Sequence, residues 1–470
     1  LMRYRDSGNG FHRDGSYIYH NIHPYNGGYG LTHFSNLARL STLLEGSKLE
    51  ISNPMKYNIF DMAYNSFESI VYKGGLMSMY TGRQVSRSYN EHQGGIGYIN
   101  ALMYLLEMAD EEQSAAIKSM IKYHAVHDTT VDYRKQGNPE IAAIMDDDSI
   151  PSDNAHCRTL IMAACDKAVQ KRENYAVGIS MSSSRIGDYD SINNENTKGW
   201  YMSDGMVYFY TDDLRAYDEG FWSTVNPYRL PGITADTQKR DEVSIYNAWL
   251  RNRDFAGGVS LEDKYGTAAM DLESYHFDEE DEGRDENYGG GKPVHNSTLV
   301  AKKAWFMFDN ALTALGSGIN STDNVDVITV VDNRKSNNME YTPDTNTKTL
   351  EIKDFEASAV PEPQNPPSAT IDGDKSTKWA ADGDVWIKYD LGEITDVGYA
   401  AISFAGGNTR KNTFELEVSE DGQKWTRTFS GQSSGTTQDF EGYTLGNKKA
   451  RFVRFVGHGN TSNAWNSILE

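Results

Sequence analysis

The sequence predicts a multidomain α + β protein in which a helical domain comes first and β-rich domains follow. Three observations support this fold class. Apolar residues recur every three or four positions up to about residue 172, and they alternate after about residue 173. A proline-rich segment, 361–367, then precedes a last β-rich stretch. We therefore expect three domains, 1–172, 173–345 and 346–470, and 470 residues are enough for several hydrophobic cores.

The predicted helices follow from this periodicity. Apolar residues at helical spacing run from Leu31 to Leu44, and Gly46 is placed to end that helix. The same pattern runs from Ile99 to Met108, and a further helix is expected from Asn154 to Lys171. In the second domain, alternation over 206–210 and the β-branched run 325–331 predict strands.

Composition limits the function. A formal net charge of −22 argues against nucleic acid or an acidic membrane surface as a partner. No stretch of about 18 apolar residues predicts a membrane span. Cys157 and Cys165, about 12 Å apart on the expected helix, are too distant for a disulfide. So few cysteines suit a secreted protein and equally a cytosolic one, and no signal peptide is visible after Leu1.

The segment Asp14–Gly30 places His20 and Tyr29 nine residues apart among glycines that can loosen the backbone. A base and a hydroxyl donor are what eliminative cleavage of a uronic acid requires. The reaction removes the proton at C5, beside the carboxylate, and expels the sugar linked at O4. It also needs neutralisation of the carboxylate and cationic support. We therefore expect His20 and Tyr29 to face each other at one end of the helical domain.

A tyrosine can act as a base near neutral pH only where cations lower its pKa, so this chemistry predicts arginines near Tyr29. The segment 81–88 supplies Arg83 and Arg87, four residues apart. On a helix this spacing would place both on one face. Taken alone, such a pair is more often a solvated helix face than a site.

These motifs together resemble polysaccharide lyase family 8, whose members act on hyaluronan, chondroitin or xanthan. The similarity includes segment 14–30, the Gly-Arg-x-x-Ser-Arg element at 82–87, the block 175–204 with its Asn-x-Glu-Asn loop, and the block 227–234. The resemblance implies a partial α/α toroid followed by an antiparallel β-sandwich. It assigns catalytic roles to His20, Tyr29 and Arg83, a supporting role to Arg87, and substrate binding to Asn193 and Glu195.

The resemblance also implies a secreted enzyme that acts on an acidic polysaccharide and needs no cofactor for catalysis, and we expect a monomer. Because the whole chain is acidic, such a substrate would have to meet a local basic cleft. The sequence departs from the family pattern before Asp14, where neither the family's carboxylate-neutralising asparagine nor its aromatic patch is recognisable. The β region is also short, so we expect a fragment or a reduced relative.

The last domain resembles the discoidin, or coagulation factor 5/8 C-type, jelly-roll β-sandwich. The similarity lies in segments 369–379, 386–392 and 451–455. In such domains an Asp-Gly-Asp loop and a terminal acidic residue hold a structural calcium ion, which makes Asp372, Asp374 and Glu470 candidate ligands. Calcium prefers several oxygen ligands, which suits this set, whereas a plain Asx turn is the alternative.

Other interpretations remain open. The pair His20 and His23 has no following Glu at metal-ligand spacing, which makes zinc improbable. The acidic run 278–282 is more typical of a solvated loop than of a calcium site. A glycoside hydrolase would use paired carboxylates. A protein that binds carbohydrate without cleaving it is the second rival, and the missing asparagine and the discoidin-like domain favour it.

Overall fold

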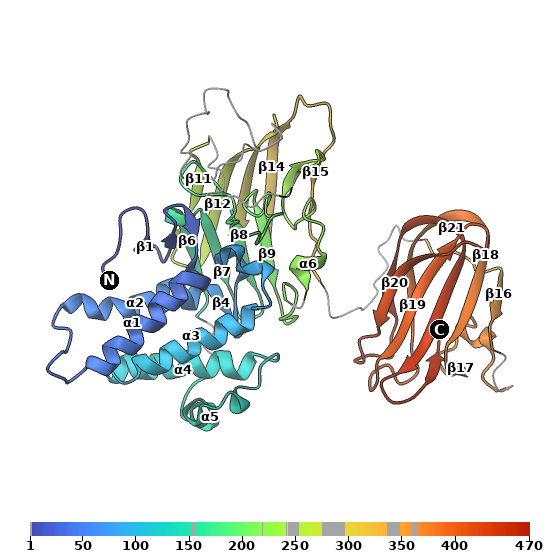
Figure 1. Cartoon of the computed structure of the whole chain (residues 1–470), viewed down its shortest axis with the longest axis horizontal. Coiled ribbons are helices and arrows are strands. Elements are labelled where there is room, and N and C mark those ends of the chain that lie inside the picture. The colour runs from blue at the N-terminus through green and yellow to red at the C-terminus, as the bar shows by residue number, and fades with distance from the viewer. Residues whose placement is uncertain are drawn as a thin grey trace. The chain divides into compact units, whose positions relative to one another are not determined.

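The computed structural model describes residues 2–152, 156–218, 220–240, 242, 253–274, 297–335, 348–359 and 364–470. The chain divides into two compact units, 1–335 and 336–470, and each is described by itself. Figure 1 shows helices and sheets in the first unit and strands in the second. The predicted fold class, helical followed by β-sandwich, is confirmed.

The helices of the first unit form one layer. They are α1 (Leu31–Leu44), α2 (Asn58–Met62), α3 (Glu91–Leu105), α4 (Glu111–His127) and α5 (Pro139–Asp146). The predicted end of α1 is confirmed, because Gly46 has a φ of +67° two residues beyond it. Asn90 and Asp110 begin α3 and α4 with capping boxes. A short α6 (Phe221–Thr224) lies far along the chain.

A four-stranded antiparallel sheet follows, in the order β6 (Arg158–Met162), β7 (Lys167–Lys171), β8 (Ala176–Ser180) and β9 (Met206–Tyr210). The predicted helix over 154–171 is wrong, because its described residues form β6 and β7. Every residue of β7 is buried, so this strand lacks the alternation that marks a half-exposed strand. Cys157 and Cys165 are both free, but the predicted reason, their separation along one helix, does not apply.

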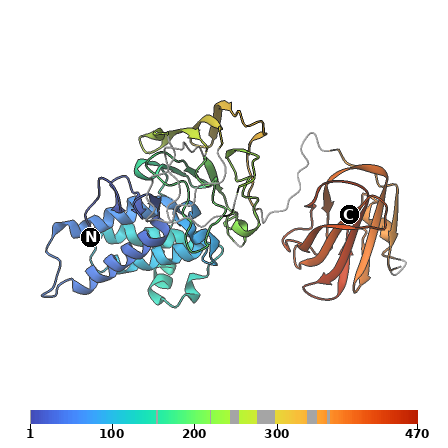
Figure 2. The same ribbon diagram turned by 45° about the horizontal axis from the view of Figure 1, so that its top comes forward.

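A second antiparallel sheet packs on the first. It contains β11 (Ala256–Leu261), β12 (Tyr265–Glu273), β13 (Val300–Met307) and β14 (Leu312–Asn320). Val177 and Ile179 of β8 share one core with Met270 and Trp305 of this sheet. Residues on the other face of the first sheet, such as Tyr208, share a core with the helices. Sheet β6–β9 therefore lies between the helices and the second sheet (Figures 1 and 2).

Short elements complete the first unit. Strands β1 (Gly10–Phe11), β2 (Tyr17–Tyr19) and β3 (His23–Pro24) form a small sheet, while β4 (Val71–Tyr72) pairs with β5 (Gly75–Leu76) and β10 (Thr234–Asp236) with β15 (Val327–Thr329). The tight helical turns are η1 (Asn26–Gly30), η2 (Pro54–Tyr57), η3 (Ala63–Phe67), η4 (Glu68–Ile70), η5 (Ser78–Tyr80), η6 (Gly82–Ser86), η7 (Tyr133–Lys135) and η8 (Ala163–Cys165). Two of the predicted site residues lie in these elements, Tyr29 in η1 and Arg83 in η6.

The second unit has its own core. Its main antiparallel sheet has the order β16 (Asp354–Ala357), β18 (Val385–Ile402), β21 (Glu441–Asn460), β19 (Asn412–Ser419) and β20 (Thr426–Gln432). Strand β17 (Trp379–Asp382) pairs with β22 (Trp465–Ile468), and a turn, η11 (Pro367–Thr370), precedes them. Trp379, Phe414 and Phe455 lie in this core. A separate core is the property expected of a domain.

No helix in the described ranges is long and apolar enough to cross a membrane. The acidic run 278–282 and the first residues of the proline-rich segment lie outside the described residues.

Candidate functional site

Tyr29 lies in η1, a single π-helical turn that continues directly into α1. Such turns occur often at functional sites. The buried Asn26 fixes η1, because its Oδ1 accepts a hydrogen bond from Tyr17 N (2.9 Å) and its Nδ2 donates to Gly15 O (2.8 Å) and Ser66 O (3.0 Å). The position of Tyr29 is therefore set by buried hydrogen bonds.

The glycines around Tyr29 provide space rather than unusual backbone angles. The backbone of Gly27, Gly28 and Gly30 is not left-handed. A Cβ atom on Gly28 would lie 2.3 Å from the Tyr25 ring, and one on Gly27 would lie 2.5 Å from Leu76 Cδ2. All three glycines lie in the turn η1, but they need no left-handed angles there. Left-handed residues at His20 (φ +50°) and Asn21 (φ +68°) turn the chain between β2 and β3.

Aromatic rings surround Tyr29. The ring of His20 lies 5.9 Å from that of Tyr29, edge to face, so the structure brings the two predicted residues together. Tyr19 stacks on Tyr29 with ring centroids 3.9 Å apart. Burial lowers the pKa of His20, and the Arg83 charge lowers it further, although Asp190 opposes both effects. Near neutral pH, His20 is therefore a neutral imidazole that can accept a proton.

Arg83 connects the site. Its Nη2 donates to the hydroxyl oxygen of Tyr29 (3.0 Å), its Nη1 to Asp190 Oδ2 (2.9 Å) and its Nε to Glu195 Oε2 (2.9 Å). The residue is 5% exposed. Burial alone would lower the pKa of Arg83, but the bond to Tyr29 and the neighbouring charges raise it overall. Arg83 thus holds a fixed positive charge against the phenol oxygen.

Arg87 reaches the same carboxylate from outside the helical turn. The prediction that it shares a helix face with Arg83 is wrong, because η6 ends at Ser86 and Arg87 has an extended backbone (φ −98°, ψ 167°). Its Nε and Nη2 donate to Glu195 at 2.5 and 2.9 Å. The hydrogen bond from Arg87 is the main cause of the lowered pKa of Glu195. Glu195 therefore bridges the two arginines.

The Asn-x-Glu-Asn loop does come from the β region, as expected, but its two predicted residues differ in placement. Glu195 contacts the arginines, whereas Asn193 is exposed with a left-handed backbone (φ +58°). Asn196 turns inward and donates to Asp190 O (2.9 Å). The predicted role of Asn193 in substrate binding therefore stays a prediction.

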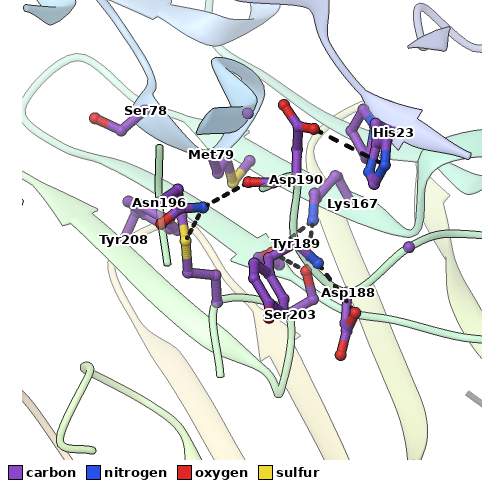
Figure 3. A pocket seen from close by; sticks show the side chains of 15 residues that line it. His23, Ser78, Met79, Lys167, Asp188, Tyr189, Asp190, Asn196, Ser203 and Tyr208 are labelled. Carbon is purple, nitrogen blue, oxygen red and sulfur yellow. Dashed lines mark hydrogen bonds and ion pairs between the residues drawn. The ribbon is translucent and has the colours of Figure 1, made fainter. Parts of the chain in front are cut away.

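A cavity borders the site at Gly82 and Asp190, and none of the predicted site residues lines it. Figure 3 shows the side chains that line this cavity. His23, Asp190 and Lys167 line it. His23 Nε2 lies 3.9 Å from Asp190 Oδ1, and burial lowers the pKa of His23 to about 4. Burial also lowers the pKa of Lys167 to about 8, and its Nζ donates to Ser180 Oγ (2.5 Å). Asp190 lies within the block 175–204, but no local pattern in that block distinguishes it from the neighbouring aspartates, which explains why sequence reasoning missed it.

The predicted calcium residues lie in the second unit. Glu470 Oε2 accepts from Gly373 N (3.1 Å), so the Asp-Gly-Asp loop does close on the last residue. Asp372 accepts from Thr377 Oγ1 (2.7 Å), and Asp374 accepts from Ser376 N (2.9 Å). Across the described residues, no group of three His, Cys, Asp or Glu side chains is arranged to hold a metal ion.

Comparison with known proteins identifies the family of the chain. Residues 159–445 match the description "Polysaccharide lyase family 8, super-sandwich domain", and residues 1–123 match "Polysaccharide lyase family 8, N terminal alpha-helical domain". The chain belongs to polysaccharide lyase family 8. A xanthan lyase from Bacillus sp. (strain GL1) is 36% identical to this family 8 chain over 342 residues, 72% of this chain and 34% of that protein.

Other members of the family are also similar. A hyaluronate lyase from Thermasporomyces composti is 31% identical over 77% of this chain and 44% of that protein. The solved structure of Paenibacillus xanthan lyase covers all of this chain and 40% of its own, with a TM-score of 0.64 and 29% identity. The chain thus spans 34–44% of the length of these three relatives.

Proposed function

We propose that this chain carries the catalytic site of a lyase that cleaves a uronic-acid-containing acidic polysaccharide by β-elimination. The observation that carries the proposal is the Arg83 guanidinium, which donates to the Tyr29 hydroxyl oxygen while two carboxylates, Asp190 and Glu195, hold it. A fixed cation at a phenol oxygen stabilises the negative charge that this oxygen carries after losing its proton. Relatives named xanthan lyase and hyaluronate lyase support the substrate class.

In the proposed reaction, Tyr29 takes the proton from C5 of the uronic acid. The electron pair of the C5–H bond forms the double bond between C4 and C5, and the bond from C4 to O4 breaks. The leaving O4 then receives a proton, which Tyr29 can return. Arg83 stays in place throughout, so no reorganisation is needed as the charge on the phenol oxygen changes.

His20 fits the same reaction as a neutral group. Its ring lies beside Tyr29, and burial keeps its pKa below the usual value, so it does not compete with Arg83 as a second cation. The side chain of Arg87 is 42% exposed and lies next to Glu195. We infer that Arg87 presents positive charge to the anionic polymer at the solvent side of the site.

Binding without cleavage is the second candidate. The side-chain amides of Asn26 and Asn196 both donate to backbone carbonyl groups. Neither amide is therefore placed to neutralise a uronate carboxylate, which the elimination needs. This observation favours the second candidate, in which the chain binds the polymer without cleaving it.

One assay separates the candidates. The 470-residue chain is incubated with hyaluronan, chondroitin and xanthan, and the ultraviolet absorbance of the C4–C5 double bond is followed. Affinity electrophoresis on the same polymers measures binding. We expect rising absorbance with at least one polymer. Retarded migration without absorbance would support binding alone, and new reducing ends without absorbance would indicate a hydrolase.

We further propose that the predicted domain 346–470 is a discoidin-like carbohydrate-binding domain. We also propose that the protein acts as a secreted monomer. In addition, we propose that calcium binds at the Asp-Gly-Asp loop. Asp372, Asp374 and Glu470 would hold the ion. The closure of this loop by Glu470 supports the calcium site, and burial together with the Asp372 charge raises the pKa of Glu470. Because the carboxylates alone do not form a full ligand set, backbone carbonyl oxygens would have to complete it.

A further inference from the structure

We propose that Asp190 is a positioning residue that fixes the Arg83 guanidinium against Tyr29. Its catalytic consequence rests on the proposed lyase function. The contact itself joins a loop that follows β8 to the turn η6, across 107 positions of sequence.

A single carboxylate oxygen of Asp190 holds both the backbone and the side chain of Arg83. Asp190 Oδ2 accepts from Arg83 N (3.1 Å) and from Arg83 Nη1 (2.9 Å). The first bond fixes the backbone of Arg83, and the second fixes the position of its guanidinium group. With Nη1 held by Asp190, the planar group turns Nη2 toward the Tyr29 oxygen.

The residues around Asp190 favour its contact with Arg83. Asp190 is 4% exposed, and its loop is held by the bonds from Gly187 N to Ile22 O (2.9 Å) and from Asn196 Nδ2 to Asp190 O (2.9 Å). A Cβ atom on Gly82 would lie 3.1 Å from Asp190 Oδ2 and 2.5 Å from the Tyr25 ring. Only glycine at position 82, with its φ of +55°, allows the carboxylate to approach this closely.

Glu195 cannot replace Asp190 in this role. Its side chain is 23% exposed, and it is shared with the more exposed Arg87. If Asp190 were lost, the Arg83 guanidinium could turn toward Glu195 and leave Tyr29. The charged and titratable groups that face this carboxylate are Arg83, His20, His23 and Tyr25.

The test compares two variants of Asp190 with a matched control in the full chain. Asp190→Asn removes the charge, and Asp190→Glu keeps it but moves the carboxylate by one methylene. Asp236→Asn is the control, because Asp236 is an equally buried carboxylate that binds Arg240 (3.1 and 2.9 Å). We expect kcat to fall about a hundredfold in Asp190→Asn and about tenfold or more in Asp190→Glu, with KM little changed. Folded Asp236→Asn should keep the kcat of the unmodified protein.

Two further readouts separate positioning from a merely structural role. Nuclear magnetic resonance titration should show lower pKa values for His20 and His23 in Asp190→Asn, because the Asp190 charge raises both. When Asp190 is present, Tyr29→Phe should shift the guanidinium resonances of Arg83. When Tyr29→Phe is combined with Asp190→Asn, it should no longer shift them.

Each outcome gives a decision. Unchanged kcat in folded Asp190→Glu, or an Arg83–Tyr29 contact that survives in Asp190→Asn, would overturn the proposal. If Asp190→Asn does not fold, Asp190→Glu decides. If the unmodified chain forms no unsaturated product, the lyase function fails, and the Arg83 resonances still test the positioning role.

Discussion

Replacing Arg83 probes the link between the structure and the proposed chemistry. Arg83→Lys keeps a positive charge, but a single ammonium group cannot bond Tyr29, Asp190 and Glu195 in the planar geometry of the guanidinium. Arg83→Ala removes the charge as well. It leaves the buried Asp190 without its partner, a change that costs about 3–5 kcal/mol of stability in comparable buried pairs.

Losing one charge-stabilising donor lowers turnover about a hundredfold or more. We therefore expect kcat to fall by at least this factor in both variants, while only Arg83→Ala loses several degrees of thermal stability. Initial rates from product absorbance and melting curves from circular dichroism measure the two effects. Arg134→Ala is the control, because Arg134 pairs with Asp146 at an exposed position where ion pairs contribute little.

The result that would refute this reasoning is a folded Arg83→Lys protein with the kcat of the unmodified chain. Turnover would then not depend on the planar guanidinium geometry of Arg83. Equal loss of activity in Arg134→Ala would show that the assay responds to general charge rather than to the site.

Three more predictions follow from the structure. Because burial lowers the pKa of His20, kcat/KM should decline on the acid side only below about pH 6.5, the usual histidine value. An acid-side decline centred at or above that pH would contradict a buried neutral His20. Burial opposes the charged form of His92, yet its bond to Asp128 raises its pKa to about 8. The contribution of His92 to stability should thus be complete below about pH 6.5 and lost as the pH rises through 8. If the melting temperature of His92→Gln falls over this pH range as much as that of the unmodified protein, the prediction is wrong. Calcium should raise the melting temperature of the second unit and chelator should lower it, with neither effect in Asp372→Asn; melting insensitive to both would remove the calcium proposal.

The sequence predicted those parts of the fold and site that depend on local patterns. The apolar spacing before Gly46 located the end of α1, and the short motifs around His20, Tyr29 and Arg83 indicated residues that the structure brings together. Each of these signals lies within a few residues of the side chain that it concerns.

The remaining features depend on tertiary contacts. Strand β7 is buried on both faces, so its sequence lacks the alternation that would have distinguished it from a helix. Arg87 lies just beyond its helical turn, where it binds Glu195, 108 residues away. Asp190 becomes important only when its loop folds onto η6, and no local pattern marks an aspartate for that role.

Mass spectrometry of the products from the unmodified chain and from Tyr29→Phe tests the central claim most directly. Elimination yields a fragment lighter by one water molecule than the corresponding hydrolysis product. We predict that the unmodified chain forms this unsaturated fragment from a uronic-acid polymer and that Tyr29→Phe, which loses only the hydroxyl group, does not. Fragments that carry the added water, or equal amounts of unsaturated fragment from both proteins, would contradict the account.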